Sequence, residues 1–131
     1  MTSGPGVAQA RTALDMWLGG GGVIRLWTVA PNFDGTGGTE SVPSGGAPTA
    51  TFAAAVAGTG GQIAKATNQG AFVLTELPVA STSVVAISVH EHSTGALKWK
   101  NDSWSSPVPW AVGESPMFPA EAFAVAFVPV S

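Results

Sequence analysis

Short runs of β-branched and aromatic residues, each closed by a turn of Gly or Pro, constrain the fold of this chain most. Residues 82–91 form the run that is richest in β-branched side chains, which predicts a central strand. The run leads into Ser93-Thr94-Gly95, a turn sequence, and residues 97–100 follow as a strand that pairs back in a hairpin. The last third of the chain therefore predicts antiparallel β-structure.

The same pattern recurs along the rest of the chain. Further strands are predicted at residues 23–29, 49–56, 62–68, 71–77, 108–112 and 123–128. The 108–112 run lies between prolines and is expected at a sheet edge, and residues 31–48 are expected to form a long loop anchored by Phe33. Seven or eight short strands separated by Gly/Pro turns predict a mainly β fold, a single β-sandwich or jelly-roll-like domain with a short N-terminal helix.

Residues 7–18 are the candidate for that helix. Apolar residues recur at helical spacing at Val7, Ala10, Leu14, Trp17 and Leu18. Ser3 is placed to cap the helix, and the glycines at 19–22 must end it. Arg11 and Asp15 are expected to pair with each other, because they are four residues apart on one helix face.

Charge is scarce in this chain. Only 10 % of its 131 residues are charged and 45 % are hydrophobic, against roughly 25 % charged residues in ordinary soluble domains. Such a surface would be sticky on a monomer, so we expect identical copies or another protein to cover much of it. Five Lys and Arg with a net charge of −3 lack the basic footprint of a nucleic-acid binder.

Three further features of the sequence indicate where in the cell the chain is made. The chain has no cysteine, which excludes disulfides and thiolate metal sites. Its first residues lack the basic segment and apolar run of a secretory signal, and no apolar stretch approaches the roughly 20 residues that span a bilayer. We therefore expect synthesis in a cytoplasm and no membrane partner.

Candidate chemistry is sparse. His90 and His92 would share one face of a strand and could reach one metal ion, but this is a weak candidate beside the plain interpretation as a polar strand end before a turn. The Asp34–Gly38 segment lacks the ligand spacing of a calcium loop and is better explained as a turn. No serine lies in a Gly-x-Ser-x-Gly motif. We expect no catalytic residues, no metal and no cofactor, and hence no enzyme.

Three tryptophans lie close together near the end of the chain, at Trp99, Trp104 and Trp110, with Lys98, Lys100, Asn101 and Asp102 between or beside them. Exposed tryptophans would stack on sugar rings or form an interface hot spot. Buried ones would be the large core residues that an Ala-rich sheet needs. We expect at least one to lie in the core and leave both surface roles open.

Several short motifs along the chain together resemble the sequence pattern of one protein family. They are residues 24–31 (Ile-Arg-Leu-Trp-Thr-Val-Ala-Pro), residues 35–40 (Gly-Thr-Gly-Gly-Thr-Glu), residues 71–73 (Ala-Phe-Val), residues 84–89, the hairpin 94–99, and residues 113–125 with Phe118-Pro119-Ala120. Together they resemble the small tail-fibre-like or minor virion structural proteins of actinobacterial tailed phages. The chain departs from the pattern at residues 45–48, where Gly-Gly-Ala-Pro replaces Gly-Tyr-x-Arg, and at Glu121, where the pattern has Gly.

The resemblance implies a virion component made in the cytoplasm of a bacterial host. Its partners would be identical subunits, as a trimer or another homo-oligomer, and the major capsid protein or tail proteins. A capsid decoration or minor capsid protein on the head is the preferred role; the alternative is a minor tail or tail-fibre protein for host attachment, with carbohydrate binding as one possibility. Residues 1–22, helix and Gly hinge, would be the docking segment and residues 23–131 the β-sandwich domain. The expected contact residues are Val7, Leu14, Trp17, Leu18, Phe33, Trp104 and Trp110.

Overall fold

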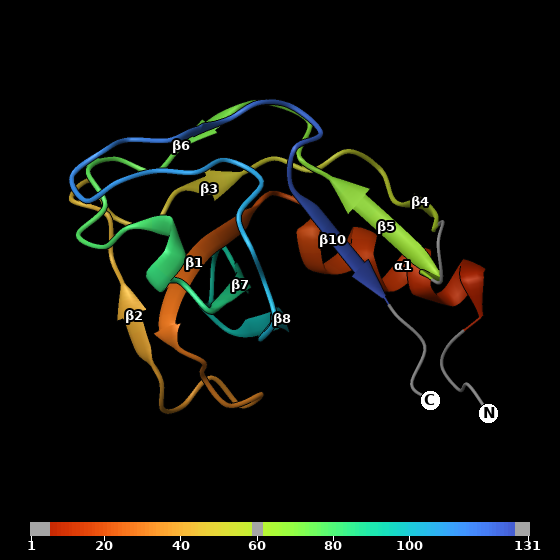
Figure 1. Ribbon diagram of the computed structural model, residues 1–131. Helices are drawn as coiled ribbons and strands as arrows, with labels where there is room; N and C mark the ends of the chain where they lie inside the picture. Colours follow the sequence, from red (N-terminus) through yellow and green to blue (C-terminus); the bar gives the residue numbers. More distant parts are fainter. Residues whose placement is uncertain (1–5, 59–61, 128–131) are drawn as a thin grey trace.

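The computed structural model describes residues 6–58 and 62–127, and these form antiparallel sheets with one α-helix (Figure 1). The main sheet contains β1 (Gly22–Val29), β2 (Thr39–Ser41), β3 (Thr49–Ala50), β7 (Ala86–Glu91) and β8 (Leu97–Asn101). A second, three-stranded sheet contains β4 (Val56–Ala57), β5 (Ala64–Thr67) and β10 (Ala124–Phe127). A third, two-stranded sheet pairs β6 (Phe72–Val73) with β9 (Met117–Phe118). The helices are α1 (Val7–Leu18) and the 3-10 turn η1 (Ser81–Ser83). A mainly β fold with one short helix is thus confirmed.

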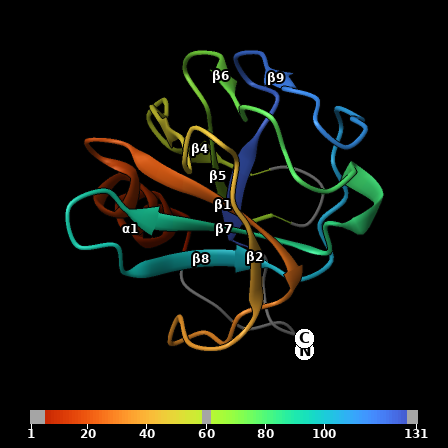
Figure 2. The same cartoon turned by 90° about the vertical axis from the view of Figure 1, so that its left-hand side faces the viewer.

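The main sheet is organised around the two longest strands, β1 and β7. Its order is β2-β1-β7-β8 (Figure 2), and β3 pairs with the start of β1. β1 and β7 run antiparallel with Ile24 opposite Val89 and Leu26 opposite Ile87, all four side chains being buried. The predicted central strand and its hairpin partner are therefore both present, since β7 and β8 pair across the turn at residues 92–96.

One hydrophobic core joins all three sheets. Phe72 of β6 stacks on Phe118 of β9 at a ring-centroid distance of 5.1 Å, and Phe123, just before β10, packs edge-on against Phe72 at 6.2 Å. Leu74 and Val125 lie fully buried in the same cluster. Because many of the other buried residues are alanines, these few large side chains fill much of the core.

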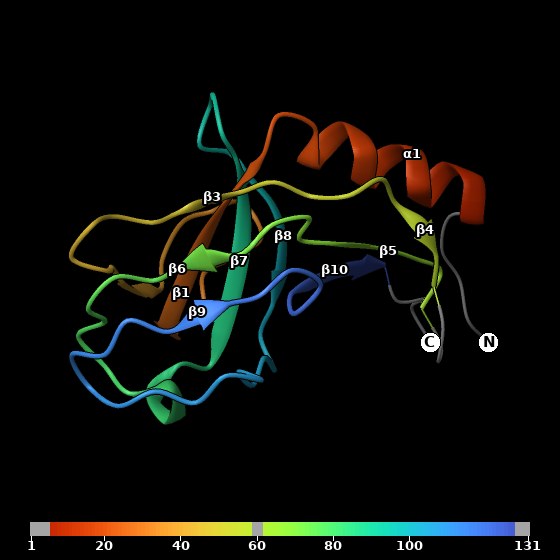
Figure 3. The same cartoon turned by 90° about the horizontal axis from the view of Figure 1, so that it is seen from above.

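The helix is part of this core, which corrects the expectation that it lies outside the β-structure. Leu14 and Leu18 are buried in the same cluster as the sheet residues, and α1 lies alongside β4 and β5 (Figure 3). Arg11 and Asp15 do not pair with each other. Instead, Arg11 Nε donates to the carbonyl oxygen of Ala55 (3.1 Å), and the N–H of Ala55 donates to Asp15 Oδ1 (2.8 Å). The two charged side chains thus hold one peptide segment against the helix.

Some strand predictions were wrong in extent. The run 49–56 is broken into β3 and β4 with a single bridge between Phe52 and Asn68, and residues 108–112 form no strand. β2 lies within residues 31–48, which were expected to be a loop, and β9 lies where no strand was predicted. Ser3 and Val128 lie outside the described residues, and the helix begins after Gly6 without a side-chain cap.

Candidate functional site

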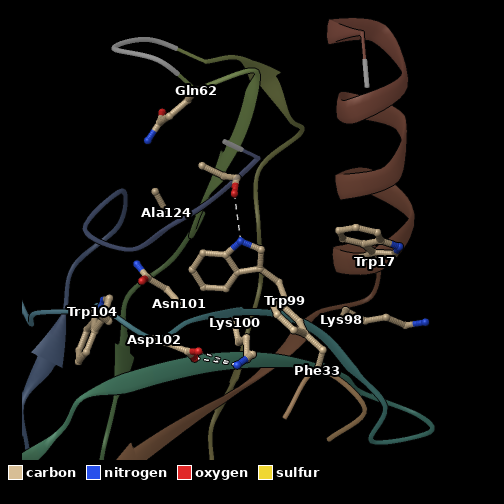
Figure 4. A pocket seen from close by; sticks show the side chains of 11 residues that line it. Trp17, Phe33, Gln62, Lys98, Trp99, Lys100, Asn101, Asp102, Trp104 and Ala124 are labelled. Atoms are coloured by element: carbon tan, nitrogen blue, oxygen red, sulfur yellow. Dashed lines mark hydrogen bonds and ion pairs between the residues drawn. The ribbon is translucent and has the colours of Figure 1, made fainter. Parts of the chain in front are cut away.

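A groove opens between α1, the outer edge of β8 and β10 (Figure 4). Its volume is about 620 Å³, within the range of roughly 300–1,000 Å³ that is usual for small-molecule sites. We call it the β8 groove. It is lined by Trp17, Phe33, Gln62, Trp104, Ala124, Ala126 and the run from Lys98 to Asp102, which covers most of β8 and the residue after it.

The position of the groove follows from the run on β8. Five consecutive residues, 98–102, line it, whereas successive side chains of a strand point to opposite faces of a sheet. A cavity on one face of the sheet would contact only every second residue, so a cavity that contacts all five lies along the edge of the strand. β7 occupies the other edge of β8, so the groove follows the free edge, where the main sheet ends.

Aromatic side chains form the walls of the groove, and the fold fixes two of them firmly. Trp99 Nε1 donates to the carbonyl oxygen of Ala126 (3.0 Å), and its ring meets Phe123 edge-on at a centroid distance of 6.2 Å. Trp104 stacks on Phe118 with centroids 6.4 Å apart. Each indole is half-buried, so each uses one side for packing and presents the rest to the groove.

Lys100 ties the groove floor to the loop of Phe33. Its Nζ donates to the carbonyl oxygen of Pro31 (2.7 Å) and to both carboxylate oxygens of Asp102 (2.9 and 2.7 Å). The same ammonium lies 4.3 Å from the centroid of the Phe33 ring, a cation–π contact. Phe33 is otherwise 78 % exposed. The expected packing anchor of the loop is therefore an exposed ring held from one side.

Three polar side chains at the groove keep unused hydrogen-bonding groups. Within the described part of the chain, the Lys98 ammonium and the Gln62 amide have no hydrogen-bond partner. Asn101 uses only its Oδ1, which accepts from the N–H of Ser103 (2.9 Å). The Asp102 carboxylate is held by Lys100 but its side chain remains 49 % exposed. The groove therefore offers donors and acceptors beside flat apolar surfaces.

Three of the expected contact residues are buried inside the chain, which corrects their assignment to an interface. Leu14, Leu18 and Trp110 are 0 %, 5 % and 5 % exposed. Trp110 Nε1 donates to the carbonyl oxygen of Val79 (2.8 Å), so this tryptophan is the core residue of the three near the end of the chain. Val7 stays exposed on α1.

The two histidines do not form a common site. His90 is buried, with Nδ1 2.9 Å from the carbonyl oxygen of Gly95 and Nε2 2.8 Å from Ser88 Oγ. A carbonyl oxygen only accepts, so Nδ1 carries the proton, Nε2 accepts from the Ser88 hydroxyl, and Ser88 Oγ accepts from Trp27 Nε1 (2.8 Å). Both ring nitrogens of His90 are thus occupied, while His92 points outward to Glu91.

Two carboxylates in turns, those of Glu91 and Asp34, accept hydrogen bonds from residues of the same turn and so stabilise it. Glu91 accepts from the hydroxyl and N–H of Ser93 and from the N–H of Thr94, which lowers the pKa of Glu91 to about 2. Hydrogen bonds from Thr36 lower the pKa of Asp34 in the same way. Among residues 6–58 and 62–127, no three His, Asp or Glu side chains are grouped so as to hold a metal ion.

The sequence pointed to part of this site. The interleaving of tryptophans with Lys98, Lys100, Asn101 and Asp102 marked the β8 side of the groove. The contribution of Gln62 and the convergence of Trp17 and Phe33 on the same groove come from the tertiary fold. No local signal in the sequence links these segments.

Comparisons with known proteins identify no relative: no family model, no curated protein and no solved structure matches this chain. Among the described residues, the 12-residue α1 and the other helical segment are too short to cross a membrane.

Proposed function

We propose that this chain is a structural protein of a tailed-phage virion, present in many copies on the head as a capsid decoration or minor capsid protein. It works as a binding surface, without catalysis or a cofactor, and assembles with identical subunits and the major capsid protein. The alternative within the particle is a minor tail or tail-fibre protein.

The observation that carries this proposal is an uncharged patch on the outer face of α1. Met16 is 74 % exposed there, and a shallow hollow of about 370 Å³ is lined by Ala8, Gln9, Thr12, Ala13 and Met16. In a chain with only 10 % charged residues, such a surface is suited to burial against a neighbouring subunit.

The phage-like motifs supply a second support, because they coincide with turn and core positions. Gly38 has a φ of +79° where the 35–40 loop turns back to β2, and Phe118 and Phe123 of the last motif are core residues. A pattern that describes turns and packing is what a shared structural role would preserve, and it contains no reactive group.

The fold is in keeping with a compact subunit. We propose that it is a variant of the β-sandwich or jelly-roll type, with the main sheet as one layer and the two smaller sheets as the other. The support is that one core cluster draws side chains from β1 and β7 as well as from β5, β6, β9 and β10.

Analysis of purified particles tests the proposed role. Quantitative mass spectrometry of phage particles from a lysate that expresses this chain should find it in many copies, and immunogold labelling should mark the heads. Label at the tail would replace the head assignment with the tail alternative. Absence of the chain from the particles would overturn the virion role altogether.

A pair of variants tests the α1 patch. Met16→Lys should reduce the copy number per particle several-fold, because the new charge would be desolvated in the contact. Met117→Lys is the matched control, since Met117 is also exposed, at 55 %, but lies on β9. Equal incorporation of both variants would remove α1 from the contact surface.

A further inference from the structure

We infer that the β8 groove is a binding site for a pyranose ring of an oligosaccharide. This inference goes beyond the proposed virion role and does not depend on it, because it concerns the isolated chain and a soluble ligand. It rests on the shape of the groove, its aromatic walls and its uncommitted polar groups.

The aromatic walls match the flat faces of a sugar ring. The face of an aromatic ring is electronegative, and the C–H groups on one face of a pyranose carry small positive charges, so the two stack. Trp99 and Trp104 are immobilised by Ala126 and Phe118, which means that little side-chain entropy is lost when a ligand binds. Phe33 offers an exposed ring on the loop side.

The polar groups match the hydroxyls that surround such a ring. Each hydroxyl both donates and accepts. Asn101 and Asp102 are adjacent and present a free amide N–H₂ and a half-exposed carboxylate side by side. Neighbouring hydroxyls could therefore donate to Asp102 and accept from Asn101. Lys98 and Gln62 add further groups without partners in the described residues.

Charge argues against a nucleic acid in this groove. Single-stranded nucleic acids also stack on aromatic rings, but they need a cationic track for their phosphates. The charge of Lys100 is neutralised by Asp102, which leaves Lys98 as the unpaired cation among the described residues of the groove, in a chain of net charge −3. A proline-rich peptide is the remaining alternative for an aromatic groove, but it would not use the cluster of Asn101, Asp102, Gln62 and Lys98.

Isothermal titration calorimetry of the purified full chain tests the inference. The probes are cellotetraose, chitotetraose, β-1,4-mannotetraose and β-1,4-galactotetraose, which differ in the orientation of their hydroxyls, together with decaproline. We expect saturable binding of at least one oligosaccharide with a Kd of about 1 mM or tighter. No oligosaccharide binding up to about 10 mM overturns the inference, and binding of decaproline alone assigns the groove to a peptide instead.

Two variants locate the binding. Phe33→Ala and Lys98→Met should each weaken oligosaccharide binding, the first by about tenfold through lost stacking. Both side chains are exposed, and Phe33 gives up only its cation–π contact with Lys100, worth about 1 kcal/mol or less at an exposed site, so both variants should remain folded. Met117→Ala and Lys65→Met, which lie on β9 and β5 away from the groove, are the matched controls and should bind normally. Unchanged affinity in both groove variants overturns the inference.

Discussion

Asn68 and Phe123 are joined by a hydrogen bond of 2.9 Å, in which the backbone N–H of Phe123 donates to Oδ1 of the buried Asn68 side chain. The Asn68 amide also donates to the carbonyl oxygens of Gly70 (2.9 Å) and Pro119 (2.8 Å). One side chain thus satisfies three backbone groups in two segments that lie far apart in sequence. These hydrogen bonds hold the segment that leads into β10 next to β5, the strand that ends just before Asn68.

Replacement of Asn68 by Leu should therefore be strongly destabilising. The apolar side chain would leave three backbone groups without their partner, at about 1–3 kcal/mol for each one that stays buried. We expect a loss of about 3 kcal/mol or more in the free energy of unfolding, measured by urea denaturation. Asn101→Leu is the control: Asn101 accepts one hydrogen bond near the surface, and its loss should cost about 1 kcal/mol or less. Similar losses for the two variants would contradict the bridging role of Asn68.

Alanine substitutions at two glycines should distinguish the stability cost of a positive φ from the added cost of a steric clash. Gly38 and Gly46 both have positive φ, +79° and +85°. A Cβ at Gly38 would lie 2.9 Å from the backbone of Pro31 and from the carbonyl oxygen of Val29, whereas a Cβ at Gly46 would meet nothing within 4 Å. Gly46→Ala should cost about 1–2 kcal/mol from the left-handed conformation alone.

Gly38→Ala should cost clearly more than Gly46→Ala, because the loop must also move away from β1. Thermal unfolding of the two variants beside the unmodified chain measures the difference. An equal drop in Tm would mean that the loop between β1 and β2 adapts freely to a methyl group.

The sequence predicted the strands that carry their own hydrophobic signal. β1 and β7 carry apolar and β-branched residues at their centres, and β8 follows a recognisable turn, so all three overlap the predicted ranges, although β7 begins at Ala86 rather than at residue 82. β6 and β9 have only two residues each and exist because Phe72 stacks on Phe118. Pairing between such short segments leaves no periodicity in the sequence, which is why β9 was missed.

The helix illustrates a different limit. Its apolar stripe was recognised, but a stripe does not say which surface covers it. The structure covers Leu14 and Leu18 with the chain's own sheets. Trp104 and Trp110 are a similar pair: both are aromatic residues near prolines, and only the tertiary fold places one at the groove and the other in the core.

The buried His90 should make stability depend on pH. Burial lowers the pKa of His90 below its ordinary value of 6.5. The neutral ring is therefore favoured by folding, so its contribution is complete above pH 6.5 and is lost as the pH falls through the lowered pKa. The Arg25–Glu40 pair also acts on this group, with Arg25 lowering the pKa and Glu40 raising it.

Urea denaturation between pH 8 and pH 5 measures this effect. The unmodified chain should lose stability over this interval, and His90→Gln, which cannot take up a proton there, should show a flatter profile. Met117→Gln is the control and should keep the slope of the unmodified chain, since it places the same side chain at an exposed position without removing a titratable group. A profile in His90→Gln as steep as that of the unmodified chain would assign the pH dependence to other groups.

The burial of one face of α1 leads to a test of whether the helix is part of the core or a docking segment. Leu14 is fully buried and Met16, two residues on, is 74 % exposed. Leu14→Ala should cost about 2–5 kcal/mol through lost packing and a cavity beside β5, whereas Met16→Ala should change stability by about 0.5 kcal/mol or less. Both substitutions introduce alanine into the same helix, so their difference in urea denaturation reports burial rather than helix propensity. If Leu14→Ala were as mild as Met16→Ala, α1 would not be packed on the sheets in solution, and its apolar stripe would again be available to a partner.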